Sequence, residues 1–259
     1  MTSAGATSSW ITYPKRNPQA SVRLFCFPYA GGAILPYCGW ADKLPTYVEV
    51  CPVMIPGRAS RLTEPAFTRL LPLVSAIAEA MLSHLNRPFA FFGHSMGATI
   101  AFELARHLRG EYGCVPLHLF VSGCRAPQLP RKTTPIYNLP ESEFIAELRR
   151  LNGTSDEVLE NPELIRLLIP TLRADFEVCG TYEYQAESPL DCPISTYGGL
   201  QDPDIGRTDL EAWSEQTTES VSVRMLPGGH FYINAPNSRL LQILLEDLCR
   251  SAEVDTYDR

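Results

Sequence analysis

Short apolar segments alternate with amphipathic ones along most of the chain. Six runs, rich in Val, Phe, Leu and Ile and bordered by Pro or Gly, have the length and composition of buried strands. These predicted strands are Val22–Phe27, Val48–Val53, Phe89–Gly93, Leu117–Ser122, Ile194–Gly198 and Val221–Leu226. Apolar runs without polar alternation are typical of strands that are covered on both faces of a parallel sheet.

Helical periodicity fills the segments between these strands. It predicts long helices at Arg69–Leu85, Met96–Leu108 and Asn237–Ser251. In the last of these, five leucines recur at spacings that form one broad apolar face. Strands that alternate with helices predict an α/β fold, in which crossover helices flank a mostly parallel central sheet.

The alternation stops after residue 124. Residues 125–140 are basic and contain four prolines, and helical patterns follow at Glu141–Leu151 and Pro162–Tyr184. Pro170 lies inside the second pattern, and we expect it to kink or split that helix, because proline lacks an N–H and its ring clashes with the preceding turn. We interpret this stretch as a helical insertion that lies over the end of the sheet.

A single domain accounts for these patterns and for the length of 259 residues. We expect this domain to span residues 21–251 and to carry a lid insertion at about 125–192. A flexible leader at 1–20 and a polar tail at 252–259 are expected to flank it.

Charge and cysteine content narrow the class of protein. A net charge of −7 argues against a nucleic-acid partner, which normally requires basic surfaces. The longest apolar runs have about five residues, whereas a membrane span needs about 20. The eight cysteines are scattered without a Cys-x-x-Cys pair, and the N-terminus lacks the basic and apolar regions of a secretory signal. We therefore expect a cytoplasmic protein without a metal site, whose cysteines serve as packing residues.

The motif Gly93-His94-Ser95-Met96-Gly97 directly follows a predicted strand and directly precedes a predicted helix. A serine at such a sharp turn has a strained backbone that pushes its Oγ out of the sheet, while the glycines let the strand and helix pass closely. The start of the helix also directs N–H groups towards any oxyanion that forms there. Ser95 is therefore the candidate nucleophile.

A nucleophilic serine needs a base, and the sequence contains five histidines. His84, His107 and His118 lie in predicted helices or at a strand position, where solvated or core roles suit them. His94 leaves the turn in another direction, so packing is its expected role. His230 lies in a glycine-rich loop between the last strand and the last helix, where this kind of fold places its base.

The third member of a triad must orient the imidazole and should follow a late strand. The loop after the fifth predicted strand offers two carboxylates, Asp202 and Asp204. Asp202 comes sooner after the strand and precedes a proline that restrains the loop, so it is preferred; Asp204 remains the alternative. The order Ser95, Asp202, His230 is typical of hydrolases with this fold.

An oxyanion hole needs two donors. The N–H of Met96, directly after the nucleophile, is expected to supply one. The other is expected from the loop Phe27–Gly32, where paired glycines allow the backbone to approach a substrate closely. We favour the N–H of Tyr29, with that of Ala30 as the alternative.

Together these segments resemble the type II thioesterases that accompany modular polyketide and nonribosomal peptide synthases. The resemblance covers about residues 22–248 and includes Pro56-Gly57-Arg58, which a generic α/β hydrolase would not be expected to carry. The segments that carry it are Phe27-Pro28-Tyr29-Ala30-Gly31-Gly32, Trp40, Pro56-Gly57-Arg58 with Arg61 and Glu64-Pro65, Gly93-His94-Ser95-Met96-Gly97, and Gly228-Gly229-His230-Phe231.

The resemblance implies a function. It implies an α/β-hydrolase fold and an enzyme that hydrolyses acyl groups from the phosphopantetheine arm of acyl or peptidyl carrier proteins, and so edits mis-primed or stalled synthases. No cofactor is expected, because the substrate carries the phosphopantetheine, and a monomer suffices for such an enzyme.

Basic residues suggest where a carrier binds. Arg58 and Arg61 are candidate contacts for the phosphopantetheine phosphate, although pairing of a loop arginine with Glu64 is the simpler interpretation. Five more cations in the insertion are candidates for meeting an acidic carrier helix, although a run of charge is usually only a solvated face: Arg125, Arg131, Lys132, Arg149 and Arg150.

Other functions share many of these features. Another serine hydrolase with this fold, such as an esterase, a peptidase, a chain-releasing thioesterase or a medium-chain fatty acyl thioesterase, would carry the same triad. A carrier-binding protein without catalysis would be expected to lack a triad residue, and all three are present here.

Overall fold

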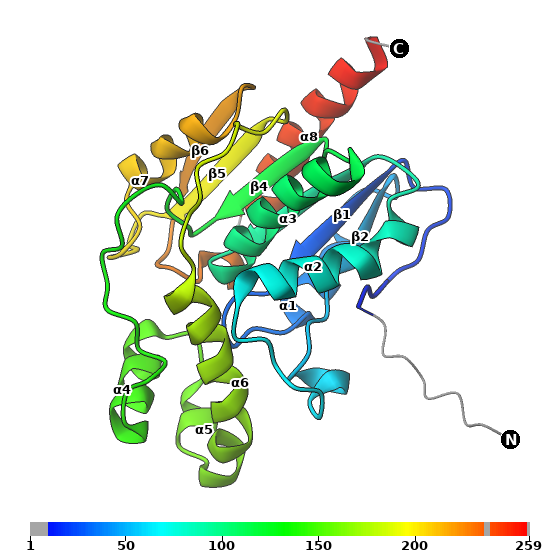
Figure 1. Ribbon diagram of the computed structural model, residues 1–259. Helices are drawn as coiled ribbons and strands as arrows, with labels where there is room; N and C mark the ends of the chain where they lie inside the picture. The colour runs from blue at the N-terminus through cyan, green and yellow to red at the C-terminus, as the bar shows by residue number, and fades with distance from the viewer. Residues whose placement is uncertain (1–9, 236–238, 258–259) are drawn as a thin grey trace, which may run out of the picture.

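Six parallel strands form the centre of the fold in a computed structural model that describes residues 10–235 and 239–257. They follow the order β2-β1-β3-β4-β5-β6, and every neighbouring pair is parallel (Figure 1). Their bounds are β1 Val22–Phe27, β2 Val48–Pro52, β3 Phe89–His94, β4 His118–Ser122, β5 Ile194–Gly199 and β6 Val221–Leu226. The connections from β1 to β2 and from β3 to β4 run in opposite directions across the sheet, so the carboxyl ends of β1 and β3 form a topological switch point.

The predicted strands are confirmed, each to within one residue at either end. Every residue of β1 to β5 is buried, whereas β6, at the edge of the sheet, is mostly half-buried. Burial on both faces is the reason that most positions of the inner strands are apolar.

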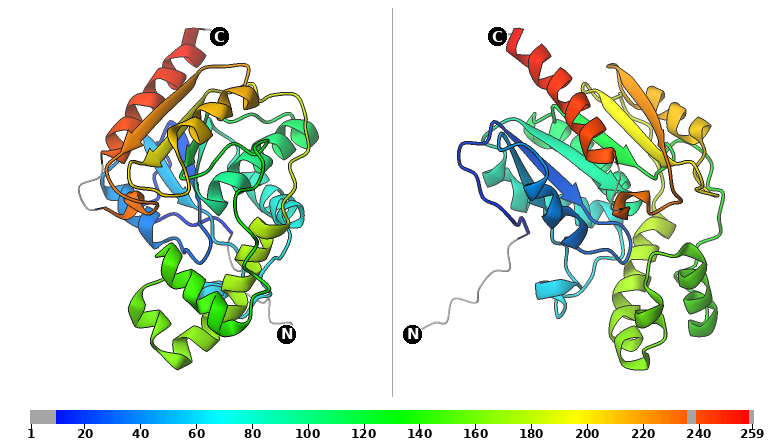
Figure 2. Two further views of the ribbon diagram at one scale, coloured as in Figure 1. Left: turned by 90° about the vertical axis from the view of Figure 1, so that its left-hand side faces the viewer. Right: turned by 180° about the vertical axis from the view of Figure 1, so that it is seen from behind.

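Helices cover both faces of the sheet. Helices α2 and α3 pack on one face together with Trp213, while α1 and α8 pack on the other (Figure 2). The helix bounds are α1 Leu35–Cys38, α2 Leu70–Met81, α3 Met96–Tyr112, α4 Glu141–Leu151, α5 Asp156–Leu159, α6 Pro162–Thr181, α7 Arg207–Glu211 and α8 Leu240–Tyr257. The α/β-hydrolase arrangement predicted from the sequence, a parallel sheet flanked by helices, is therefore present.

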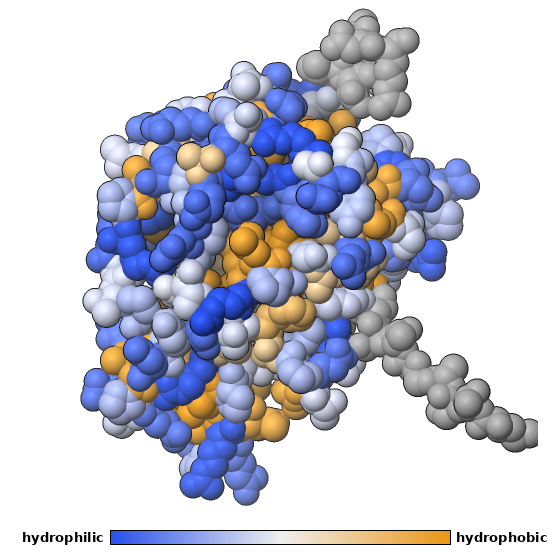
Figure 3. All heavy atoms as spheres, viewed as in Figure 1, coloured by the Kyte–Doolittle hydropathy of each residue, from blue (hydrophilic) through white to orange (hydrophobic). Residues whose placement is uncertain are grey.

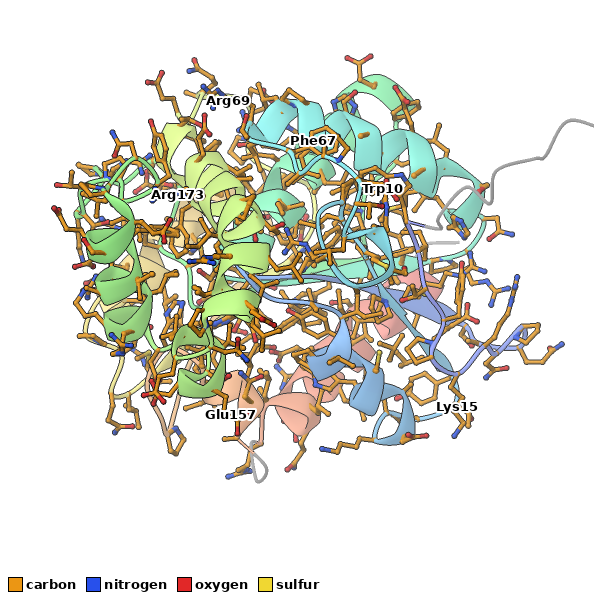
Figure 4. All side chains as sticks on the ribbon, turned by 90° about the horizontal axis from the view of Figure 1, so that it is seen from below. Trp10, Lys15, Phe67, Arg69, Glu157 and Arg173 are labelled. Atoms are coloured by element: carbon orange, nitrogen blue, oxygen red, sulfur yellow. The ribbon has the colours of Figure 1, made fainter. Side chains whose placement is uncertain are left out.

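Helices α4 to α6 lie beyond the carboxyl ends of the strands, as Figure 1 shows at the bottom of the molecule. They have a small core of their own, formed by Phe144, Leu148, Leu159, Ile165, Ile169 and Leu172. In the view from below, Arg173 extends from α6 (Figure 4); it lies 4.5 Å from the centre of the Phe144 ring in α4. The helices of the insertion thus pack against one another beyond the carboxyl ends of the strands.

The insertion differs from the sequence prediction at two points. Helix α6 continues through Pro170 as one helix, so of the predicted kink or split the split is wrong. Ile169 and Leu172, on either side of the proline, are buried in the core of the insertion, and this burial offsets the missing hydrogen bond. The pattern also missed α5, because a four-residue helix is shorter than the repeat that reveals amphipathicity.

The two ends of the domain also differ from expectation. Ile11 is buried and bridges to Val53, and the N–H of Thr12 donates to Pro52, so the flexible leader expected over 1–20 does not describe residues 10–20. Residues 1–9 lie outside the described part. Helix α8 continues to Tyr257 through most of the predicted tail; residues 258–259, and Asn237 at the predicted start of the helix, also lie outside it. Among the described helices, none is long and apolar enough to cross a membrane.

Candidate active site

Ser95 occupies a strained turn between β3 and α3. Its backbone angles are φ 53° and ψ −118°, a region that residues with a side chain rarely adopt. The flanking glycines allow the turn: a Cβ on Gly93 would lie 2.1 Å from the Gly97 carbonyl oxygen, and one on Gly97 would lie 2.3 Å from the Phe27 carbonyl oxygen. The N–H of Ser95 donates to the Ser122 carbonyl at 2.8 Å, which anchors the turn to β4.

Asp202 and His230 form a hydrogen-bonded pair beside this turn. Nδ1 of His230 lies 2.7 Å from Oδ2 of Asp202, whose carboxylate is fully buried. The second oxygen, Oδ1, accepts hydrogen bonds from the N–H groups of Asp204 and Ile205, at 2.9 and 3.2 Å. Burial would raise the pKa of Asp202, but the hydrogen bonds from His230 and the Asp204 N–H outweigh it and lower that pKa below its ordinary value.

The geometry distinguishes the two candidate carboxylates. The Asp204 side chain is 44% exposed and lies 4.0 Å from Arg150, whereas its backbone N–H serves Asp202. Asp202 is therefore the carboxylate that orients His230.

His94 is fully buried next to this pair. Its Nδ1 lies 2.9 Å from the Ser122 hydroxyl, and its ring centre lies 4.9 Å from that of His230. Burial, with a smaller effect of the His230 charge, lowers the pKa of His94 well below its ordinary value. His94 is thus a neutral packing residue, as the sequence predicts.

The loop after β1 meets the turn on the other side. Tyr29, Ala30, Ser95 and His230 line one small cavity of about 80 Å³. The glycine contact between Gly97 and Phe27 described above presses the start of α3 against this loop. The residues predicted to supply the oxyanion donors, Met96 and Tyr29, therefore lie on either side of the candidate nucleophile.

A larger pocket of about 640 Å³ opens from Ser95 and His230. Figure 3 shows hydrophobic residues gathered in the middle of this face, between the upper layer of helices and the insertion. The apolar lining residues of the pocket include Leu70, Met96, Phe102, Leu129, Val178 and Trp213. An apolar pocket of this size next to a strained serine suits an acyl chain.

The wall of this pocket also contains three of the predicted cations, Arg125, Arg131 and Lys132. Arg125 and Lys132 both pair with the buried Asp209, at 3.1 and 2.7 Å, and Arg131 donates to backbone carbonyls of α6 and the loop after it. Lys132 remains half exposed. The other two predicted cations form ion pairs with neighbouring carboxylates: Arg149 with Asp156 and Arg150 with Glu147.

Arg58 and Arg61, the predicted contacts for the phosphopantetheine phosphate, both form ion pairs inside the protein. Both side chains are buried. Arg58 pairs with Asp175 of α6 at 2.6 Å, while Arg61 pairs with Glu64 at 2.6 Å and lies over the Trp10 ring at 4.0 Å. The loop after β2 contacts the insertion through Arg58, whose two Nη atoms are paired, while its buried Nε has no hydrogen-bond partner among the described residues.

Sequence reasoning also missed Asp175. This carboxylate is buried on α6 and accepts the N–H of Gly31 at 2.7 Å in the loop after β1. An acidic residue in a helix with no motif around it gives no signal of such a role, and its partner lies 144 positions away in the chain.

A strained serine after a parallel strand, beside a hydrogen-bonded histidine and aspartate, is the arrangement of an α/β-hydrolase. The Thioesterase domain family matches residues 22–250, so the chain belongs to the thioesterase domain family.

Three known proteins show how close the similarity is. Linear gramicidin dehydrogenase LgrE of Brevibacillus parabrevis is 49% identical over 92% of this chain and 91% of its own. The RedJ thioesterase from the prodiginine pathway of Streptomyces coelicolor is 41% identical, with a TM-score of 0.81 over 87% of this chain and 85% of its own. The type II thioesterase BorB from the borrelidin cluster is 35% identical, with a TM-score of 0.84 over 92% and 97%. The predicted resemblance to type II thioesterases is confirmed.

Proposed function

We propose that this protein is a type II thioesterase that hydrolyses acyl groups from the phosphopantetheine arm of carrier proteins. In this role it clears mis-primed or stalled units from a polyketide or nonribosomal peptide synthase. The observation that carries the proposal is the hydrogen bond between Asp202 and His230 beside the strained Ser95. Membership of the thioesterase domain family and similarity to the RedJ and BorB thioesterases support it.

The acylation step uses the geometry of this site. His230, held by Asp202, takes the proton of Ser95 as its Oγ attacks the thioester carbonyl carbon. The N–H groups of Met96 and Tyr29 stabilise the oxyanion, and such donors are each worth about 10²–10³ in rate. The carbon–sulfur bond then breaks, and the phosphopantetheine thiol leaves with the proton from His230.

Deacylation reverses the roles with water. His230 takes a proton from a water molecule, which attacks the acyl-serine carbonyl; Ser95 leaves as the alcohol and the free acid departs. Besides water, these two reaction steps use only side chains and backbone groups of this chain. We propose that they need neither a metal nor an organic cofactor. We also propose that the enzyme acts as a monomer, because one chain contributes every group named.

The cell compartment and partner follow from the same proposal. All eight cysteines are free thiols, which fits the reducing cytoplasm where we place the enzyme. An acyl or peptidyl carrier protein would deliver its arm to the pocket that contains Arg125, Arg131 and Lys132.

Steady-state hydrolysis tests the proposal. Wild-type protein is expected to hydrolyse acyl groups from a carrier protein and from a small pantetheine thioester faster than a matched oxyester. Ser95→Ala is expected to retain the fold and lose turnover, since it removes the nucleophile. A preference for the oxyester would favour a general esterase, and a preference confined to medium-chain fatty acyl groups would favour a fatty acyl thioesterase. Thioester hydrolysis by Ser95→Ala would contradict the proposal.

The relative LgrE is named as a dehydrogenase, so hydride transfer is another reaction to consider. A dinucleotide-binding fold marks its phosphate loop with Gly-x-Gly-x-x-Gly after the first strand. No two glycines of this chain are separated by a single residue, and the loop after β1 is Pro28-Tyr29-Ala30-Gly31-Gly32. We therefore do not propose dehydrogenase activity.

A further inference from the structure

Helix α6 of the insertion contacts the loops after β1 and β2 through one face. Thr171 and Asp175 are one turn apart; Oγ1 of Thr171 donates to the Gly57 carbonyl at 2.7 Å, and Oδ2 of Asp175 accepts the N–H of Gly31 at 2.7 Å. Leu172 lies between them and packs so closely on Gly31 that a Cβ there would be 2.6 Å from Leu172 Cδ2. The insertion therefore touches the loop that is proposed to hold the oxyanion.

A buried ion pair strengthens this contact. Oδ1 of Asp175 lies 2.6 Å from Nη2 of Arg58, and Nη1 of Arg58 donates to the Gly32 carbonyl at 2.8 Å. The side chains are only 7% and 3% exposed. The carboxylate of Asp175 thus accepts a hydrogen bond from the N–H of Gly31, while the guanidinium of Arg58 donates one to the carbonyl of Gly32. The ion pair therefore fixes both ends of this dipeptide.

These two contacts also constrain the backbone of Tyr29. The N–H of Gly32 donates to the Tyr29 carbonyl at 2.8 Å, which closes a turn over Tyr29–Gly32. Gly31 adopts φ 73°, a conformation that glycine permits. Since the ion pair fixes the last two residues of the turn, it also fixes the direction of the N–H groups at its start, beside Ser95 in the small cavity.

We propose that Asp175 and Arg58 are positioning residues for the oxyanion loop, and that α6 sets the geometry of catalysis in addition to covering the pocket. This inference rests on the proposed thioesterase function. Neither side chain needs to touch the substrate. A buried ion pair is weak evidence for stability, because the desolvation cost largely cancels the attraction, so a geometric role is the one that the contacts support.

The test separates positioning from folding. In Asp175→Leu the N–H of Gly31 loses its acceptor, and kcat for a pantetheine thioester is expected to fall about 10²-fold, as for the loss of one oxyanion donor. KM is expected to change less than about threefold. Asp175→Asn keeps one acceptor oxygen for Gly31 but turns its amide NH₂ towards Arg58, so its kcat is expected to lie between those of wild type and Asp175→Leu.

The double variant Arg58→Met/Asp175→Leu removes both charges. It is expected to regain the Tm that Asp175→Leu loses, because no unpaired charge remains buried, yet its kcat is expected to stay low. As a control, Glu49→Leu breaks the buried pair with Arg23 at the amino ends of β1 and β2, opposite to the end of β1 that carries the oxyanion loop. It is expected to lower Tm without changing kcat.

An inhibitor pair supplies a second readout. Ser95 adds to an alkyl trifluoromethyl ketone to give a hemiketal whose oxyanion occupies the oxyanion hole, whereas the matched S-alkyl pantetheine thioether has no carbonyl. Asp175→Leu is expected to weaken the ketone as much as it lowers kcat/KM and to leave thioether binding unchanged.

Recovery of kcat together with Tm in the double variant would overturn the inference, and so would unchanged ketone affinity in Asp175→Leu. The proposed function fails separately: wild-type protein without thioester hydrolysis, or Ser95→Ala with it, would remove both claims before any Asp175 variant is compared.

Discussion

The backbone of Ser95 lies in a conformation that costs of order 1–3 kcal/mol, and two neighbouring glycines make it sterically possible. The strain lies where a reactive hydroxyl must project from the end of a buried strand. The motif was readable in the sequence because the required small residues are adjacent to the serine in the chain.

The sequence alone does not decide which of two aspartates belongs to the triad. Asp202 and Asp204 are two positions apart and have the same side chain, so only the path of the loop decides which one faces His230. The structure places Asp202 against the imidazole and turns the side chain of Asp204 outward.

Replacement of each aspartate by asparagine tests this assignment. Asp202→Asn is expected to lower kcat by about 10³–10⁴, since an amide neither holds the correct tautomer of His230 nor stabilises its charged form. Asp204→Asn keeps the backbone N–H that serves Asp202 and is expected to change kcat less than about threefold. Steady-state kinetics on a small thioester distinguishes the two, and a larger loss in Asp204→Asn would refute the assignment.

Arg58 and Arg61 show that the partner of a residue cannot always be predicted from its neighbours in the sequence. Arg58 is a candidate phosphate contact because arginine suits bidentate recognition of phosphate, but in the structure it pairs with a carboxylate 117 positions away on a helix. Long-range pairings of this kind leave no periodic signal. In contrast, Glu64 is near Arg61 in the sequence, and the pairing considered there is present.

At the level of elements, strands were easier to predict than the insertion. Each inner strand is buried on both faces, so most of its positions are apolar and the few polar ones have buried partners. The helices of the insertion bury only a narrow stripe, and α6 tolerates an interior proline because neighbouring contacts hold it. Local rules therefore describe the sheet well and the insertion only in part.

Helix α8 is attached to the sheet by a buried polar cluster. Nδ1 of His118 lies 2.7 Å from the Ser251 hydroxyl, and Nε2 lies 2.8 Å from the Ser195 hydroxyl, which also donates to Asp247. Burial lowers the pKa of His118 to about 4, despite the opposing effect of the Asp247 charge. The folded state thus disfavours the protonated form.

This cluster predicts a pH-dependent stability. Between pH 6.5 and pH 4 the unfolded chain binds a proton at His118 that the folded protein excludes, so stability falls as the pH falls through this window. Between pH 7 and pH 5 the contribution of His118 is about 2 kcal/mol. Urea unfolding of His118→Gln should show a drop smaller than that of wild type by this amount.

His107→Gln is the matched control, because His107 lies on α3 outside the cluster. It is expected to keep the wild-type drop between the two pH values. Equal drops in wild type and His118→Gln would show that protonation of His118 does not weaken the attachment of α8.

Across the whole molecule, the net charge of −7 opposes binding to an acidic carrier protein. The pocket wall brings together three cations, Arg125, Arg131 and Lys132, beside the carboxylates of Glu183 and Asp204, and Lys132 is half exposed. Electrostatic attraction over a few ångströms can act locally even where the net charge is repulsive, because salt screens charges beyond about 8–10 Å.

Charge reversal at this position tests carrier binding. Lys132→Glu is expected to raise KM about three- to tenfold for a carrier-bound substrate and to leave KM for a small thioester nearly unchanged, since only the former brings an acidic surface. Lys15→Glu, at an exposed pair remote from the pocket, is the matched control and should affect neither. Equal changes for both substrates in Lys132→Glu would rule out a docking role.

Covalent capture of the acyl group tests directly whether Ser95 is the nucleophile. Wild-type protein is mixed with a carrier loaded with a slowly hydrolysed acyl group, quenched within the first turnover, and analysed by mass spectrometry of the intact chain and its peptides. An acyl-serine mechanism predicts an added acyl mass on the peptide that contains Ser95, and none in Ser95→Ala. Hydrolysis without that adduct, or an adduct at another residue that forms and decays at the turnover rate, would contradict it.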